Sequence, residues 1–286
     1  MAAYTTNFIG ADGLKVFYRE AGPKDAPVIL LLHGFPTSSH QFRNLIPLLS
    51  HKYRVIAPDL PGFGFTEVPA ELNYKYNFDN IANSIEAFLD VLSIKKFSVY
   101  IFDYGAPTGL RLALRRPESI QAILSQNGNA YEEGLGDIWA PIQAYWKSGS
   151  TEDREVVRGA MLSLDAVKWQ YETGSRFPVA PEAPYLDFAL MERPGNFEIQ
   201  LDLFYDYRTN LDIYPHVQEY FRKSQVPTLV AWGKHDQFFI PPGAEAFKRD
   251  LKAAEVHLLD AGHFAGETDT KDIAELILKF LEKNGI

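Results

Sequence analysis

The chain of 286 residues is 46% hydrophobic and 14% aromatic, a composition that excludes a disordered protein and suits one buried core with an insertion. Its 28 basic and 37 acidic residues give a net charge of −9, which repels phosphate backbones and anionic lipids, so we expect neither nucleic acid nor a membrane as a partner. The lack of cysteine excludes disulfides, thiolate metal sites and a cysteine nucleophile.

The amino-terminal segment, residues 1–7, has neither a basic start nor an apolar run, so it does not resemble a secretion signal. No stretch approaches the roughly 18 apolar residues that a membrane span requires. We therefore expect a cytoplasmic protein. The seven histidines are scattered without the spacing of a metal site, and we expect no metal and no cofactor.

The first part of the chain predicts a sheet that begins with an antiparallel pair of strands joined by a turn at residues 11–13. Ser38 and Gln41 form a potential capping box for a helix that continues to about Leu49. The run before this helix is continuously apolar, which is typical of a central strand covered on both faces. The strands expected here are 5–9, 15–20, 27–32 and 53–57.

The loop after the fourth strand contains Gly62 and Gly64, a spacing that occurs in phosphate-binding loops. Glu67 stands where a dinucleotide-binding loop has its third glycine, so this interpretation is excluded. Asn77 then caps a helix whose apolar residues follow the three-and-four spacing of a stripe that faces the core. That stripe consists of Phe78, Ile81, Ala82, Ile85, Phe88, Leu89 and Leu92.

The next strand, 97–102, turns abruptly into a helical pattern, which leaves one or two residues to make the turn. Asp103 stands at the apex, with Gly105 two places on. A side chain at such an apex projects from the carboxyl edge of the sheet. We therefore predict that Asp103 is a nucleophile.

After a strand at 120–124, the alternation of strands and helices stops from about residue 131 to residue 213, and aromatic residues accumulate there. The alternation then resumes. One strand of the resumed pattern leads into a loop with Asp236, and the next ends close to His263. The order of nucleophile, acid and histidine matches that of a hydrolase triad, with room for an inserted segment before the acid.

These residues resemble the α/β-hydrolase superfamily and, within it, the aspartate-nucleophile branch of epoxide hydrolases and haloalkane dehalogenases. The resemblance covers almost the whole chain. It implies an α/β-hydrolase fold with a mostly parallel central sheet flanked by helices, a core of residues 1–130 and 214–286, and an inserted helical cap at 131–213. It is carried by His33-Gly34-Phe35-Pro36, Asp59-Leu60-Pro61-Gly62-Phe63-Gly64, the Asp103 turn, Gly233-Lys234-His235-Asp236 and Gly262-His263.

The resemblance also implies a chemistry. A carboxylate nucleophile suits attack on saturated carbon, so Asp103 would displace an epoxide oxygen or a halide and form an alkyl ester. His263, oriented by Asp236, would activate water to hydrolyse that ester. The backbone N–H groups of Phe35 and Tyr104 would form the oxyanion hole.

Epoxide opening needs an acid, and the family uses tyrosines of the cap for this purpose. Tyr207 lies in a segment similar to that of epoxide hydrolases and is our first candidate, with Tyr145 near the place of the second tyrosine. Dehalogenases hold the halide with a tryptophan after the nucleophile and often an asparagine after His-Gly; here Tyr104 and Phe35 stand at those places.

The sequence thus predicts an epoxide hydrolase that converts a small or medium apolar epoxide into a vicinal diol. The partners would be this electrophile and water, and both a monomer and a homodimer are compatible. The alternatives are a haloalkane dehalogenase with the same triad and a non-catalytic ligand-binding protein on this fold. Trp139 and Trp146 are predicted to line the substrate pocket. Ile101 stands before the turn at a position that is small in the family, which works against a tight turn.

Overall fold

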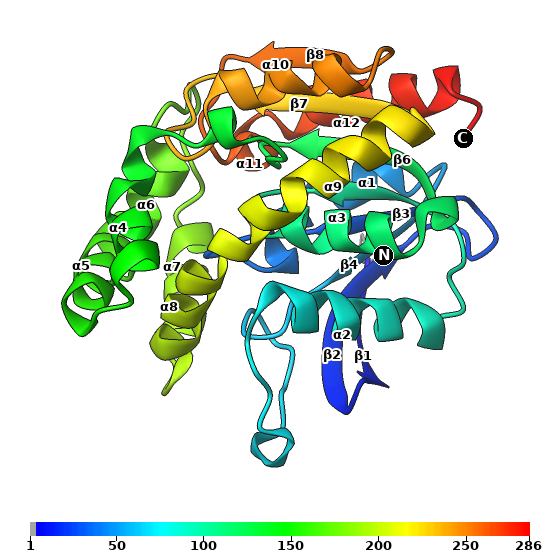
Figure 1. Ribbon diagram of the computed structural model, residues 1–286. Coiled ribbons are helices and arrows are strands. Elements are labelled where there is room, and N and C mark those ends of the chain that lie inside the picture. The colour runs from blue at the N-terminus through cyan, green and yellow to red at the C-terminus, as the bar shows by residue number, and fades with distance from the viewer. Residues whose placement is uncertain (1–3) are drawn as a thin grey trace.

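An eight-stranded sheet runs through the computed structural model, which describes residues 4–286 (Figure 1). The strands are β1 (Thr5–Ala11), β2 (Leu14–Ala21), β3 (Val28–Leu32), β4 (Arg54–Pro58), β5 (Phe97–Ile101), β6 (Ile120–Gln126), β7 (Thr228–Gly233) and β8 (Glu255–Leu259). They lie side by side in the order β1-β2-β4-β3-β5-β6-β7-β8. β2 pairs antiparallel with β1 and β4, and the neighbours from β4 to β8 pair in parallel. Residues 1–3, in the segment where we predict no secretion signal, lie outside the described residues.

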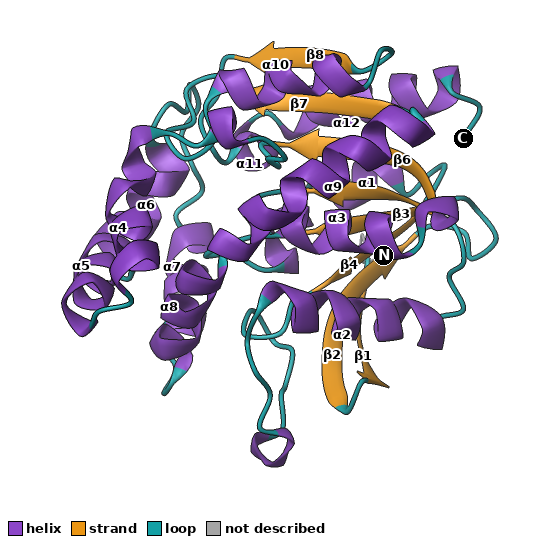
Figure 2. Cartoon of the chain, in the orientation of Figure 1, coloured by secondary structure: helices purple, strands orange, loops and turns teal. Residues whose placement is uncertain are grey.

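Helices cover both faces of this sheet (Figure 2). The helices of the core are α1 (Leu45–Leu49), α2 (Phe78–Val91), α3 (Gly105–Arg115), α10 (Pro241–Asp250), α11 (Ala265–Thr268) and α12 (Thr270–Lys283). α1 packs with α12 on one face, and α2 packs with α3 on the other. β5 is buried at every residue because both faces are covered, which explains its continuous apolar sequence. The predicted α/β fold with a mostly parallel sheet is confirmed.

A helical insertion lies between β6 and β7 and is called the lid below. Its helices are α4 (Ala140–Ser148), α5 (Thr151–Met161), α6 (Leu164–Glu172), α7 (Glu182–Met191), α8 (Asn196–Asp206) and α9 (Arg208–Ser224). α4 to α8 stand at the left edge of the sheet in Figure 1, and α9 returns from them to pack against α3. The boundary expected at residue 213 therefore falls inside α9, because this helix continues without interruption past Pro215.

The two helix caps predicted from the sequence, at Asn77 and Ser38, differ in how far the structure confirms them. Asn77 caps α2 as predicted, since its side chain accepts a hydrogen bond of 2.8 Å from the backbone N–H of Asn80. The single helix expected from Ser38 to Leu49 is wrong. Ser38 instead caps a 3₁₀ turn, η1 (Ser39–Phe42), and the buried amide of Gln41 has no partner. The reason is Pro47, which has no N–H and whose ring would clash with a preceding carbonyl in a continuous helix, so that a new helix begins just before it.

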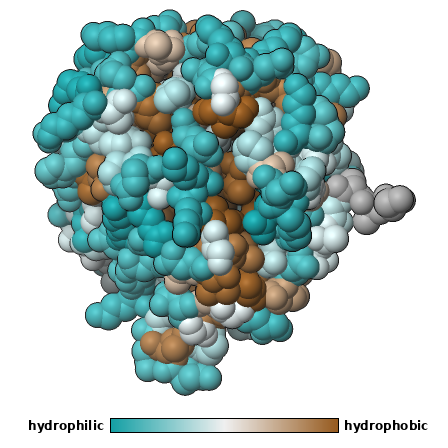
Figure 3. Space-filling view, turned by 90° about the vertical axis from the view of Figure 1, so that its right-hand side faces the viewer, coloured by the Kyte–Doolittle hydropathy of each residue, from teal (hydrophilic) through white to brown (hydrophobic). Residues whose placement is uncertain are grey.

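Four further 3₁₀ turns lie between the larger elements: η2 (Ala70–Leu72), η3 (Pro117–Ser119), η4 (Glu132–Gly134) and η5 (Asp137–Trp139). The side of the molecule opposite the lid is mostly hydrophilic, with an apolar strip in its lower centre (Figure 3). Exposed large apolar side chains belong to separate elements, among them Phe8 on β1, Val91 on α2 and Leu258 on β8. None of the helices between residues 4 and 286 is long and apolar enough to cross a membrane.

Candidate active site

Asp103 occupies a sharp turn between β5 and α3. Its φ of 47° lies in the left-handed region, which few residues other than glycine and asparagine or aspartate adopt. Gly105 permits this turn, because a Cβ atom there would lie 2.2 Å from the carbonyl oxygen of Leu32. The branched side chain of Ile101 fits because it lies against Gly109, where a Cβ would come within 2.6 Å of it. The turn therefore forms in spite of Ile101.

The two oxygens of the Asp103 carboxylate have different surroundings. Oδ1 accepts a hydrogen bond of 2.6 Å from the backbone N–H of Phe35, and the N–H of Tyr104 is a second backbone donor to this carboxylate. Oδ2 lies 3.9 Å from Nε2 of His263. Oδ1 thus occupies the place of a stabilised oxyanion, while Oδ2 remains available to attack a substrate.

The predicted acid and histidine meet beside Asp103. Nδ1 of His263 lies 2.7 Å from Oδ2 of Asp236, and all three side chains are buried. Oδ1 of Asp236 accepts a hydrogen bond of 2.7 Å from the backbone N–H of Phe238. The carboxylate therefore holds Nδ1 as the protonated nitrogen of the ring and leaves Nε2, which faces Asp103, free to accept a proton.

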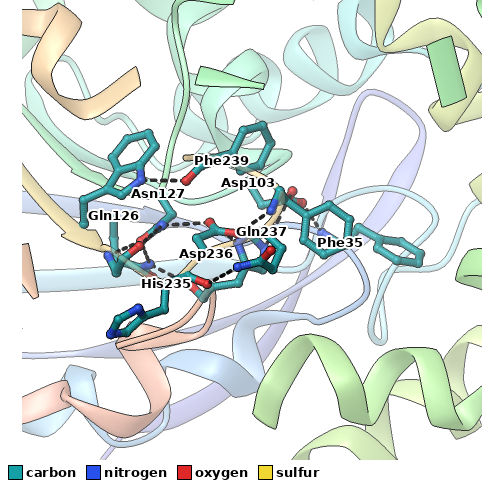
Figure 4. A network of polar contacts seen from close by, with 12 residues as sticks. Phe35, Asp103, Gln126, Asn127, His235, Asp236, Gln237 and Phe239 are labelled. Carbon is teal, nitrogen blue, oxygen red and sulfur yellow. Dashed lines mark hydrogen bonds and ion pairs between the residues drawn. The ribbon is translucent and has the colours of Figure 1, made fainter. Parts of the chain in front are cut away.

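Two amide side chains at the end of β6 complete this arrangement. Asn127 donates a hydrogen bond of 2.7 Å to Oδ2 of Asp236, and its own oxygen accepts one of 2.8 Å from the N–H of Gly233. Gln126 donates to the oxygen of Asn127 and to the backbone carbonyl of His263. Figure 4 shows Asp236 between Asn127 on one side and the Asp103–Phe35 contact on the other. This pair of amides fixes both the acid and the backbone of the histidine.

The surroundings raise the pKa values of Asp103 and His263. Burial raises the pKa of Asp103 to about 6, although His263 and the N–H groups of Phe35 and Tyr104 act in the opposite direction. For His263, burial is the largest single influence and lowers the pKa, but the Asp236 and Asp103 carboxylates together outweigh it, so the pKa is raised. At neutral pH Asp103 is therefore ionised but weakly solvated, which favours it as a nucleophile.

We expect the Asp103 carboxyl to titrate near pH 6 in the native protein and at higher pH in a His263→Gln variant. The reason is that the charge of protonated His263 lowers the pKa of Asp103, and glutamine of similar size removes this charge. NMR of protein with isotope-labelled aspartate would measure both midpoints, and the Asp103→Ala spectrum would identify the resonance. A midpoint that is unchanged or lower in His263→Gln would contradict this coupling.

Aromatic rings from the lid pack on Tyr104, the residue next to Asp103. Tyr207, at the junction of α8 and α9, packs on Tyr104 with ring centroids 5.8 Å apart and on Trp139 with centroids 4.5 Å apart. Trp146 stacks on Tyr207 with centroids 6.1 Å apart, and its ring also lies 5.8 Å from that of Trp139. Burial raises the pKa of Tyr207 well above its usual value, and the Asp103 carboxylate contributes to this shift. Tyr207 is therefore a buried, protonated phenol close to Asp103.

Tyr207 has a second tyrosine behind it, but this is not Tyr145. The hydroxyl of Tyr207 lies 3.5 Å from that of Tyr214, which accepts a hydrogen bond of 3.4 Å from Asn129. The hydroxyl of Tyr145 instead accepts a hydrogen bond of 2.8 Å from Arg154, and its ring packs on Tyr205. The structure therefore brings Tyr207 to the site and places the Tyr145 hydroxyl against an arginine within the lid.

The two predicted pocket tryptophans lie in this aromatic cluster, but their N–H groups are engaged. Trp139 donates a hydrogen bond of 3.0 Å to the carbonyl oxygen of Phe238, and Trp146 donates one of 2.7 Å to that of Phe204. Both tryptophans thus contribute ring surface rather than free donors. The sequence interpretation missed the supporting roles of Gln126, Asn127 and Tyr214, although the first two stand at the carboxyl end of a central strand, where parallel sheets gather functional residues.

Comparisons with known proteins show the family to which the chain belongs. A model of the α/β-hydrolase fold family matches residues 27–270. A protein of Saccharomyces cerevisiae described as an uncharacterized hydrolase is 51% identical over 279 residues, which cover 96% of this chain and 95% of that protein. A haloalkane dehalogenase of Psychrobacter cryohalolentis is 26% identical, with 95% of this chain and 88% of that protein covered.

Solved structures show the same fold. A haloalkane dehalogenase from Bradyrhizobium elkani superposes with a TM-score of 0.79 at 23% identity, and 99% of each chain is covered. An epoxide hydrolase from Vigna radiata superposes with a TM-score of 0.76, also at 23% identity and with 99% of each chain covered. The chain therefore belongs to the α/β-hydrolase family.

Proposed function

We propose that this protein is an epoxide hydrolase that opens a small or medium apolar epoxide to a vicinal diol. The observation that carries the proposal is the buried Tyr207 phenol, which lies close to Asp103 and remains protonated at neutral pH. An epoxide oxygen leaves as an alkoxide and needs a proton, which a phenol supplies. The relatives include proteins described as epoxide hydrolases and as haloalkane dehalogenases, so the leaving group must be decided from the site.

In the first step Oδ2 of Asp103 attacks one epoxide carbon, the carbon–oxygen bond breaks, and the released oxygen takes the proton of Tyr207. The product is an ester between Asp103 and the hydroxyalkyl group. In the second step His263 takes a proton from water, which attacks Cγ of Asp103 while Oδ1 carries the negative charge toward the Phe35 and Tyr104 N–H groups. The tetrahedral intermediate expels the diol oxygen, which takes the proton from His263, and the new carboxylic acid of Asp103 returns a proton to Tyr207.

A haloalkane dehalogenase is less well supported. A halide leaves as an anion and requires free N–H donors rather than an acid. The N–H groups of Trp139 and Trp146 are bonded to backbone carbonyl oxygens, and that of Trp232 donates 2.7 Å to the carbonyl of Phe239. The fourth tryptophan of the sequence, Trp169, is 40% exposed to solvent. A purely ligand-binding protein has no need of a histidine held for proton transfer, so the Asp236–His263 contact argues against that alternative.

We expect Tyr207→Phe to lower kcat for epoxides by about 10²-fold or more, because general acid catalysis contributes roughly 10²–10⁴-fold. Diol formation from a panel of epoxides and halide release from a panel of haloalkanes would be measured with the same preparations. The matched control is Tyr205→Phe, a neighbouring lid tyrosine that packs on Tyr145. Halide release by the wild type with no diol from any epoxide would overturn the proposal in favour of a dehalogenase, and a Tyr207→Phe variant as active as Tyr205→Phe would remove Tyr207 as the acid.

A further inference from the structure

The lid returns to the core through a short junction between two of its helices. Tyr207 stands at this junction, between Asp206 at the end of α8 and Arg208 at the start of α9. α9 then packs against α3, which begins at Gly105, just after Asp103 (Figure 1). The proposed acid and the proposed nucleophile therefore each precede one of two helices in contact. A group that holds α9 against α3 also fixes these two residues relative to each other.

One arginine connects the two helices. Arg111 on α3 is 4% exposed, and its Nη1 donates a hydrogen bond of 2.6 Å to Oδ1 of Asn210 in the first turn of α9. Its Nη2 donates one of 3.2 Å to the hydroxyl of Thr209 in the same turn. Nη1 also donates to the carbonyl oxygen of Pro107, in the first turn of α3. The guanidinium group therefore joins the beginnings of both helices.

A third helix holds the same guanidinium group in place. Nε of Arg111 donates a hydrogen bond of 2.7 Å to Oδ1 of Asp79 on α2, so that each nitrogen of the group has a partner. The planar fork of an arginine presents its donors at fixed angles, whereas a lysine offers a single nitrogen on a flexible stem. An arginine is therefore suited to fix α9 relative to both α2 and α3.

Asn210 is the partner of Arg111 on the lid side, and its surroundings indicate what it contributes. The side chain is fully buried, and within residues 4–286 its amide nitrogen has no hydrogen-bond partner. A buried polar atom without a partner is unfavourable, and an apolar side chain of similar shape would avoid this cost. The contribution of Asn210 to the fold thus lies in the oxygen that it offers to Arg111.

The junction is also held on the other side of Tyr207. Oδ2 of Asp206 accepts a hydrogen bond of 2.8 Å from the backbone N–H of Phe78, at the start of α2. The ring of Phe78 packs on Tyr104 and on Tyr207, with centroids 5.0 Å and 5.7 Å apart, and the guanidinium carbon of Arg111 lies 5.8 Å from its centroid. Tyr207 is therefore fixed by contacts of the residues before and after it in the chain.

We propose that Arg111 is a positioning residue that sets the place of Tyr207 relative to Asp103 by holding the first turn of α9 against α3. Its guanidinium group is bonded to protein groups on three helices, so it acts through Tyr207 rather than on the substrate. This inference rests on the proposed function, in which Tyr207 protonates the epoxide oxygen while Asp103 attacks carbon. Loss of the contact should slow this step, because a displacement of about 1 Å costs up to about 10²-fold in rate.

The test measures ester formation by itself. Each protein carries His263→Ala, which is expected to trap the ester on Asp103, and intact mass spectrometry follows the gain of one epoxide with time. Arg111→Met keeps a long side chain and removes the donors. We expect this change to slow ester formation by about ten- to 100-fold when Tyr207 is present. In a Tyr207→Phe background it should have little effect, because residues that act through one group are not additive.

The matched control is Arg115→Met. This arginine lies one turn further along α3 and pairs with Asp79 and Glu86 of α2. It should leave the rate of ester formation unchanged in both backgrounds. If Arg111→Met caused the same loss with and without Tyr207, its role would be structural. That result, or no loss in either background, would overturn the inference and leave the proposed function in place.

A second pair of variants tests the lid side of the contact and replaces Arg111→Met if thermal unfolding shows that this protein does not fold. Asn210→Leu has a similar shape without the acceptor and should repeat the loss. Asn210→Asp keeps an acceptor for Arg111 and should retain the rate. Equal rates in these two variants would overturn the inference alone. Failure of every epoxide to form an ester, or ester formation at the full rate in Tyr207→Phe, would overturn the proposed function and this inference together.

Discussion

A His263→Ala variant given an epoxide should accumulate a covalent ester on Asp103 while its steady-state turnover falls by about 10⁴- to 10⁶-fold, as loss of a member of a triad does in other hydrolases. The reason lies in the separation of the two steps. Oδ2 of Asp103 needs no base to attack carbon, whereas hydrolysis of the ester needs Nε2 of His263 to take a proton from water. Intact mass spectrometry would detect the ester, and peptide mapping would place it.

The mass of the adduct identifies the chemistry. A gain equal to the whole epoxide on the peptide that contains Asp103 is the expected result. A gain equal to an alkyl group without its halogen, obtained from a haloalkane, would favour a dehalogenase instead. His257→Ala serves as the control, because this histidine on β8 is partly exposed and pairs with Glu255 outside the site. A folded His263→Ala protein without any adduct would contradict the role of Asp103 and favour the ligand-binding alternative.

An Asp103→Ala variant should lose both turnover and the ability to form the ester, with kcat reduced by about 10⁴-fold or more. Since the other carboxylates at the site are held away from the substrate, none replaces it. Asp236, the nearest, is engaged by His263, Asn127 and the N–H of Phe238. The rate of diol formation and the intact mass after incubation with the epoxide would be measured together with thermal unfolding.

The stability of Asp103→Ala distinguishes a functional carboxylate from a structural one. The native structure raises the pKa of Asp103, so its ionised form destabilises the folded state above about pH 6, and alanine removes this penalty. Alanine at a φ of 47° introduces an opposing strain. We therefore expect a free energy of unfolding close to that of the wild type. Asp260→Ala, which removes an exposed aspartate paired with Lys234, is the control for both measurements. A marked loss of stability in Asp103→Ala alone would indicate a structural carboxylate.

The surroundings of Asp103 suit the proposed attack of this carboxylate on carbon. Burial weakens its solvation, which makes the ion more reactive but also raises its pKa. The backbone N–H groups of Phe35 and Tyr104 and the nearby His263 counteract this effect, so that Asp103 remains ionised at neutral pH. In the proposed mechanism the same N–H groups later face the oxyanion of the tetrahedral intermediate. One set of donors therefore serves both steps.

Features that depend on neighbouring residues in the chain could be predicted from the sequence. The apolar runs at β3 and β5 indicated buried strands, because a strand covered on both faces has no polar side. The abrupt change from a strand to a helix indicated the turn at Asp103. The order of Asp103, Asp236 and His263 indicated a triad, since each follows a strand whose carboxyl end lies at the same edge of the sheet.

Other features were decided by contacts between residues that are far apart in the chain. A single helix was predicted from Ser38 to Leu49, but the structure has the two short helices η1 and α1. This depends partly on Asp59, which accepts a hydrogen bond from the N–H of Ser39. The direction of Tyr145 depends on Arg154, and the use of the Trp139 and Trp146 N–H groups depends on backbone carbonyls from other elements. A hydrogen-bonding group can have many partners, and only the packed structure selects one.

The sequence by itself therefore determined the fold family, and it predicted that Asp103, Asp236 and His263 would lie together, because both follow from local patterns and their order. The tertiary structure alone decided that Asn127 holds Asp236 and that Tyr214 stands behind Tyr207. These are properties of side-chain direction and burial, which arise only when the lid packs onto the sheet.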